Sequence, residues 1–191
     1  MLDKKFRLLL LIIFLIGISS CGKNTDKSPV SGKEEADPFV SVRIFYDSAM
    51  TNGNQMLISE AVEKINDFLS KNPDSPKGKE AYSMLSSCYI NLKRYDDAIN
   101  TYNTIISKYP DTKEAINAYI QIGSIYEEFL KDKQKAIDAY QKFLDKYGNT
   151  QDTTMTYMIQ SVKLLKENLE TGKSFEDIIK EPVEKQKTEK K

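Results

Sequence analysis

The 191-residue sequence contains no histidine and no tryptophan, and it has only two cysteines, Cys21 and Cys88. The absence of histidine removes the commonest general base and the commonest metal ligand of enzymes. The sequence also lacks a glycine-rich phosphate loop, a nucleophile elbow and any metal-ligand spacing. Glu127 and Glu128 are adjacent, but neighbouring side chains on a helix diverge and cannot act as an acid and base pair. We therefore expect no enzyme, no catalytic residue, no metal site and no cofactor.

An excess of charge of one sign is also lacking, because 28 Lys and Arg residues balance 28 Asp and Glu residues. Nucleic-acid-binding domains usually carry a clustered basic excess that meets the phosphates. The balanced charge therefore predicts no nucleic-acid partner.

The first 20 residues have a basic start, an apolar run from Leu8 to Ile16 and small residues that lead into ISSC at 18–21. The apolar run is too short for a permanent membrane span, so we interpret residues 1–20 as a signal peptide. ISSC resembles the bacterial lipoprotein signal, in which the cysteine is acylated and becomes the mature N-terminus. The resemblance implies that Cys21 carries lipid and anchors the protein to a membrane; a plain secreted protein is the alternative. By the same resemblance, Gly22 favours the outer membrane, with the protein facing the periplasm.

Residues 21–38 comprise the lipidated cysteine and a run rich in Gly, Ser, Pro and charge, which predicts a flexible tether. If Cys21 is lipidated, Cys88 has no disulfide partner within the chain. Cys88 lies in an apolar helical pattern, and we interpret it as a small core residue.

Three similar breaks divide the remaining sequence: SKNPDS at 70–75, SKYPDT at 107–112 and DKYGNT at 145–150. Each interval holds two segments of helical periodicity, and proline or glycine ends the second. First segments pair an aromatic residue with a small one four positions later, and second segments each carry an alanine followed by an apolar stripe. The small side chains let antiparallel helices approach closely. These residues are Phe45 with Ala49, Tyr82 with Ser86, Tyr119 with Gly123, and then Ala61, Ala98 and Ala136. Ser75 and Pro76 predict the N-cap and first residue of the segment that follows them.

This pattern resembles the tetratricopeptide repeat (TPR), a helix pair of about 34 residues. The resemblance implies an all-α fold, a TPR α-solenoid of antiparallel helix pairs with three repeats plus a C-terminal capping helix. The repeat domain is expected at 39–182, with repeats at about 42–75, 79–112 and 116–149 and capping helices at 153–182. The first repeat is degenerate, and the charged residues 183–191 predict a disordered tail.

The capping segment continues the repeat register. Tyr157 and Ser161 are expected at its aromatic and small positions. Its apolar stripe is Met158, Val162, Leu165 and Leu169. In a truncated partner helix, Phe175, Ile178 and Ile179 are expected to face inward.

In TPR stacks the first helices line a concave face that binds peptides or protein segments. The resemblance places on this face Arg43, Tyr46, Met50, Glu80, Ser83, Ser87, Asn91, Asn117, Ile120, Ser124 and Glu127. The family's clamp for chaperone C-terminal carboxylates uses Lys, Arg and Asn at these places, whereas Ser, Ile, Met and Glu predominate here. We therefore expect protein or peptide segments of the cell envelope as partners, but not that carboxylate ligand.

A lipoprotein signal, a tether and repeats with a period of about 37 residues resemble the BamD-type lipoproteins that assemble outer-membrane β-barrels. The repeats also resemble the C-terminal module of the Tol–Pal-associated periplasmic protein. The sequence thus predicts an envelope scaffold that recruits protein partners, including a role in outer-membrane protein assembly. The alternatives are a cell-division coordinator of the Tol–Pal-associated type and an accessory domain of cell-wall enzymes.

Overall fold

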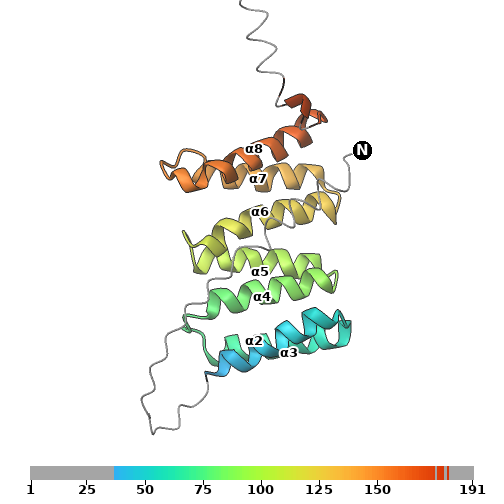
Figure 1. Ribbon diagram of the computed structural model, residues 1–191, viewed down its shortest axis with the longest axis vertical. Helices are drawn as coiled ribbons and strands as arrows, with labels where there is room; N and C mark the ends of the chain where they lie inside the picture. Colours follow the sequence, from blue (N-terminus) through green and yellow to red (C-terminus); the bar gives the residue numbers. More distant parts are fainter. Residues whose placement is uncertain (1–36, 175, 179, 181–191) are drawn as a thin grey trace, which may run out of the picture. The chain divides into compact units, whose positions relative to one another are not determined.

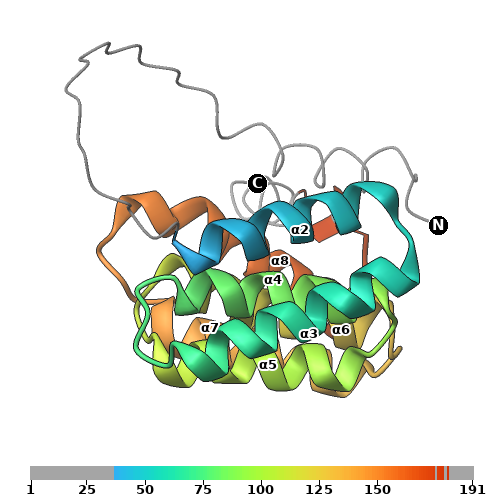
Figure 2. The same ribbon diagram turned by 90° about the horizontal axis from the view of Figure 1, so that it is seen from below.

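Antiparallel α-helices follow one another through the computed structural model, which describes residues 37–174, 176–178 and 180. Their order is α2 (Pro38–Asn52), α3 (Gln55–Lys71), α4 (Gly78–Asn91), α5 (Tyr95–Lys108), α6 (Lys113–Glu128), α7 (Lys133–Tyr147), the short 3-10 helix η1 (Thr153–Met155) and α8 (Thr156–Thr171). Each helix contacts the next along the chain, and α4 also contacts α6. The helices therefore form a stack in chain order (Figure 1), and the pairs overlie one another when viewed from the α2–α3 end (Figure 2). The predicted all-α solenoid of helix pairs is confirmed in the described residues, which contain no strand.

Short polar side chains begin several of these helices. Asp37 caps α2 by accepting from the Phe39 amide at 2.9 Å, and Pro38 occupies the first turn. Asp132 caps α7 in the same way, accepting from the Lys135 amide at 3.0 Å. The first helix thus begins at Pro38, before the expected start of the first repeat at 42.

The prediction that Ser75 and Pro76 begin a helix is wrong. α4 begins at Gly78, because the chain first makes a turn in which the Gly78 amide donates to the Ser75 carbonyl at 2.9 Å. The Ser75 hydroxyl accepts from the Lys77 amide at 3.1 Å and so stabilises this turn instead of the helix end.

The turn inside each helix pair requires a left-handed residue. Gly53 provides it in the first pair with φ of 64°, whereas Lys93 and Lys131 adopt φ of 58° and 57° in the second and third. Side chains with a Cβ are strained in this conformation, so the two lysines carry a local cost that glycine avoids.

The small residues predicted from the sequence lie where neighbouring helices meet. Ala61, Ala98 and Ala136 of the second helices are buried, as are Ala49 and Ser86 of the first helices. Gly123 allows a close approach, because a Cβ built there would lie 2.3 Å from Cε1 of Tyr140. Cys88 is a free, buried thiol in the first core cluster, and burial raises its pKa to about 12. The interpretation of Cys88 as a core residue is confirmed.

Helix α8 packs differently from the first helices before it. Tyr157 is 87% exposed and Ser161 is also exposed, so the prediction that they occupy the aromatic and small packing positions is wrong. The predicted stripe of Met158, Val162, Leu165 and Leu169 does pack against the third core cluster. The helix presents this stripe to the stack and its polar side to solvent, which is how a cap shields the end of a solenoid.

Several sequence predictions concern residues outside the described part of the chain. These are the signal peptide 1–20, Cys21 and the tether as far as residue 36, Phe175, Ile179 and the tail 183–191. Ile178 is described and is buried, and its amide donates to the Ser174 carbonyl at 3.1 Å.

Candidate protein-interaction site

The eleven residues predicted to bind partners lie on α2, α4 and α6, the first helices of three pairs. We call this set the first-helix face: Arg43, Tyr46 and Met50 from α2, Glu80, Ser83, Ser87 and Asn91 from α4, and Asn117, Ile120, Ser124 and Glu127 from α6. All except Arg43 and Asn91 are half-buried. They are thus only partly accessible to a partner.

The charges at one end of the first-helix face pair with each other. Arg43 Nη1 contacts Glu80 Oε1, which links α2 to α4, and Arg43 Nε lies 3.2 Å from Asp47 Oδ2. A second link joins α4 to α6 through Lys79 Nζ and Glu114 Oε2, which are 3.5 Å apart. Partly exposed pairs of this kind contribute about 0–1 kcal/mol each. Arg43 and Glu80, both predicted to meet a ligand, are therefore already engaged in joining adjacent repeats.

Tyr46 and Ser87 meet across the junction of the first two pairs. Burial raises the pKa of Tyr46, and a hydrogen bond with Ser87 partly opposes that shift. Tyr102 of α5 is buried, and burial raises its pKa as well. The charge that Tyr46 would acquire adds to this rise in pKa. The three side chains stay neutral in ordinary buffers and present hydroxyl groups, not charge.

A second group of polar residues surrounds the hydroxyl of Tyr140, a fully buried side chain of α7. The hydroxyl donates to Glu127 Oε2 at 3.0 Å and lies 3.4 Å from Ser124 Oγ. Burial is the main cause that raises the pKa of Tyr140. Tyr140 belongs to the third core cluster, and its hydroxyl also positions two residues of the first-helix face. The sequence signal for this contact was the glycine at 123, which leaves room for the ring.

The remaining polar side chains of the face bond to their own helices. Ser83, Ser87 and Asn91 donate to the carbonyls of Lys79, Ser83 and Ser87 at 3.0, 3.1 and 2.9 Å. Met50 packs against the first core cluster and Ile120 against the third. The face thus combines hydroxyl oxygens, amides and apolar patches, and its single arginine is paired. These features suit a polar, weakly charged protein segment better than a free carboxylate.

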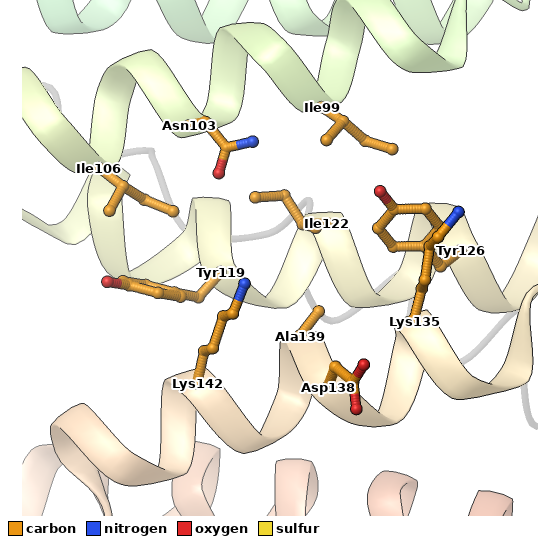
Figure 3. A pocket seen from close by; sticks show the side chains of 10 residues that line it. All are labelled: Ile99, Asn103, Ile106, Tyr119, Ile122, Tyr126, Lys135, Asp138, Ala139 and Lys142. Carbon is orange, nitrogen blue, oxygen red and sulfur yellow. The ribbon is translucent and has the colours of Figure 1, made fainter.

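A cavity of about 380 Å³ lies elsewhere, between α5, α6 and α7 (Figure 3). Its lining residues are Ile99, Asn103 and Ile106 from α5, Tyr119, Ile122 and Tyr126 from α6, and Lys135, Asp138, Ala139 and Lys142 from α7. We call it the α5–α7 cavity. Its aromatic and aliphatic residues also belong to the second and third core clusters or pack against them.

Comparison with known families identifies the repeated unit. Residues 80–112 and 117–150 each match the family model of the tetratricopeptide repeat. These two segments are tetratricopeptide repeats. The two matched TPR units coincide with the pairs α4–α5 and α6–α7, and the stack of helix pairs is a TPR α-solenoid. No curated protein matches the chain in sequence.

TPR units bind protein partners, and the fold therefore supports a protein-interaction scaffold. The described residues contain no group of histidine, cysteine or carboxylate side chains that could hold a metal ion. None of the helices in residues 37–174, 176–178 and 180 has the length and hydrophobicity that a membrane crossing requires.

Proposed function

We propose that this protein is a lipid-anchored scaffold of the bacterial cell envelope, which binds protein partners through the first-helix face. One observation carries the proposal: a single chain joins the lipoprotein-like ISSC signal to two matched TPR units. A lipid anchor would raise the effective concentration of the scaffold near membrane partners, so that a weak intrinsic affinity suffices. Gly22 favours the outer membrane, and the likeness to BamD-type lipoproteins favours a role in β-barrel assembly.

The anchor is tested with Cys21→Ala. We expect an unprocessed precursor that incorporates no labelled fatty acid, while the parent protein is processed and labelled. Cys88→Ala is the matched control, because it removes the other cysteine and should leave acylation unchanged. Equal labelling of the Cys21→Ala protein would refute lipidation at this residue.

The binding face is tested by replacing Ser87 and Ser124 together with arginine. We expect this variant to lose the partners that crosslink to the parent protein in intact cells, while its far-UV circular dichroism stays unchanged. The control replaces Ser59 and Ser107, which are exposed serines of α3 and α5, with arginine. If the first variant folds and still crosslinks to the same partners, the first-helix face is not the binding site.

The assembly role is tested separately by depleting the protein and measuring folded outer-membrane β-barrels. A fall in their levels, with soluble periplasmic proteins unchanged, is the expected outcome. Unchanged levels of folded β-barrels would refute the assembly role. The scaffold would then serve another task in the envelope, such as coordinating cell division.

A further inference from the structure

The α5–α7 cavity lies on the side of α6 away from the first-helix face. Tyr119, Ile122 and Tyr126 line the cavity, whereas Ile120, Ser124 and Glu127 belong to the face. Helical periodicity places these two sets on opposite sides of one helix. The cavity volume of about 380 Å³ is within the range of ligand-binding pockets, ~300–1,000 Å³. It can thus bind a group independently of the first-helix face.

The residues that line the cavity carry two positive charges, Lys135 and Lys142, and one negative charge, Asp138. Lys135 is paired with Asp132, with 3.2 Å between Nζ and Oδ2, and its ammonium lies 5.4 Å from the centre of the Tyr126 ring. Asp138 accepts from Gln134 Nε2 at 2.9 Å. Among the described residues, Lys142 has no ion-pair or hydrogen-bond partner. Figure 3 shows both lysines extending from α7 toward α6, with Asn103 extending from α5 into the same space. The rim therefore offers a cation and an amide beside apolar surface.

The preceding repeat provides an internal comparison. In the first helices, the register that aligns Ser86 with Gly123 matches the floor residues Tyr119, Ile122 and Tyr126 to Tyr82, Leu85 and Tyr89, and in the second helices Ala98 aligns with Ala136. The wall residue Asn103 likewise corresponds to Asn66. The rim differs, because Lys135 and Lys142 correspond to Asp97 and Thr104. The apolar floor is therefore part of the repeat architecture, whereas the two cations belong to this cavity.

We propose that the α5–α7 cavity binds an acidic segment of a protein partner. One aromatic or aliphatic side chain of the segment enters between Tyr119 and Tyr126, where it contacts Ile122. A neighbouring carboxylate pairs with the ammonium of Lys142, and Asn103 donates its amide to the backbone of the segment. Charge complementarity selects an acidic segment, because the lining carries two lysines and one aspartate and because Lys142 has no ion-pair partner among the described residues. This site is separate from the first-helix face and adds a second contact surface to the scaffold.

The test uses the purified full-length protein in detergent and three synthetic peptides. The probe is Asp-Asp-Phe-Asp-Asp, and the controls are Asp-Asp-Ser-Asp-Asp and Lys-Lys-Phe-Lys-Lys. Saturation-transfer NMR detects weak binding and reports which peptide protons touch the protein. We expect the strongest transfer to the phenylalanine ring of the acidic peptide and much weaker transfer to both controls.

Lys142→Thr introduces the residue found at the equivalent position of the preceding repeat. It should lower the affinity for the acidic peptide about two- to fivefold. Lys133→Thr removes the same charge from α7 at a residue that does not line the cavity, and should leave binding unchanged. Ser87→Arg on the first-helix face should also have no effect, which separates this site from the proposed function. Equal binding by Lys142→Thr and the parent protein would overturn the proposal. Equal binding of the serine and phenylalanine peptides, or no detectable binding of the acidic peptide, would overturn it as well.

Discussion

Gly123→Ala sets two effects of opposite sign against each other. In a helix interior, alanine is favoured over glycine by about 1 kcal/mol, so helix propensity alone predicts stabilisation. At Gly123, however, the new Cβ would lie 2.3, 2.6 and 2.8 Å from three ring atoms of Tyr140. Distances this short require the ring or the helix to move.

Tyr140 has little freedom to move. Its side chain is fully buried, and its hydroxyl is held by Glu127 Oε2 at 3.0 Å. Overpacking of a buried site costs about 1–3 kcal/mol, and losing this hydrogen bond adds roughly 0.5–1.5 kcal/mol. These costs exceed the propensity gain, and we expect Gly123→Ala to lower the free energy of unfolding by about 1–3 kcal/mol.

Urea unfolding followed by far-UV circular dichroism measures the change. Ser86→Ala is the matched control, because Ser86 occupies the equivalent position in α4 and already carries a Cβ. It loses only the hydroxyl bond to the Tyr82 carbonyl at 3.0 Å, so its effect should be smaller. Valine has no δ carbons, so in a Tyr140→Val background the three clashing atoms are absent and Gly123→Ala should stabilise the protein. Stabilisation by Gly123→Ala in the parent protein would refute the close packing of α6 on α7.

Three further substitutions or conditions test other parts of the stack. Ala98→Leu should destabilise the protein by roughly 1–3 kcal/mol through overpacking, because Ala98 is fully buried; an unchanged melting midpoint would contradict this packing. Lys131→Gly should raise the free energy of unfolding by up to about 1 kcal/mol, because relief of a left-handed lysine outweighs the added freedom of the unfolded chain; a lower urea midpoint would contradict it. Burial raises the pKa of Cys88, Tyr102 and Tyr140 in the folded protein, so stability should fall above about pH 8.5, where the unfolded thiol ionises. It should fall further above about pH 10, where unfolded tyrosine ionises. Melting midpoints measured across this range check the third expectation, and Tyr140→Phe should reduce the alkaline loss.

The repeat pattern predicted the fold because its small residues are set by contacts inside each helix pair. Ala61, Ala98 and Ala136 recur at the repeat period, and all three are buried. The pattern gave a wrong prediction at α8, where Tyr157 and Ser161 have the spacing of the aromatic and small residues but are exposed. The residues equivalent to Ala118, Ile122 and Ile125 of α6 are Thr156, Gln160 and Lys163 in α8. This polar substitution rotates the helix away from the repeat register, and it could have been recognised in the sequence.

The first-helix face was less predictable, because its contacts cross from one repeat to the next. The register placed Arg43 and Glu80 on the same face, but only the packing of α2 against its neighbours brings the two together as an ion pair. The reach of Tyr140 to Ser124 and Glu127 likewise depends on how closely α7 approaches Gly123. Spacing within a helix carries no direct information on either distance.

At the α5–α7 cavity, a comparison between repeats of the same chain separates residues needed for helix packing from residues available for binding. A search for one repeat's pattern finds Tyr119 and Tyr126 and assigns them to the core, since Tyr82 and Tyr89 occupy the same positions one repeat earlier. When the two repeats are aligned with each other, the floor residues are shared and the rim residues differ. The main difference is Lys142, which replaces Thr104. A repeat that only had to pack would not need this cation, because an exposed threonine or lysine serves packing equally well at the rim. The exchange of Lys142 for threonine therefore tests whether the difference between repeats is used for binding.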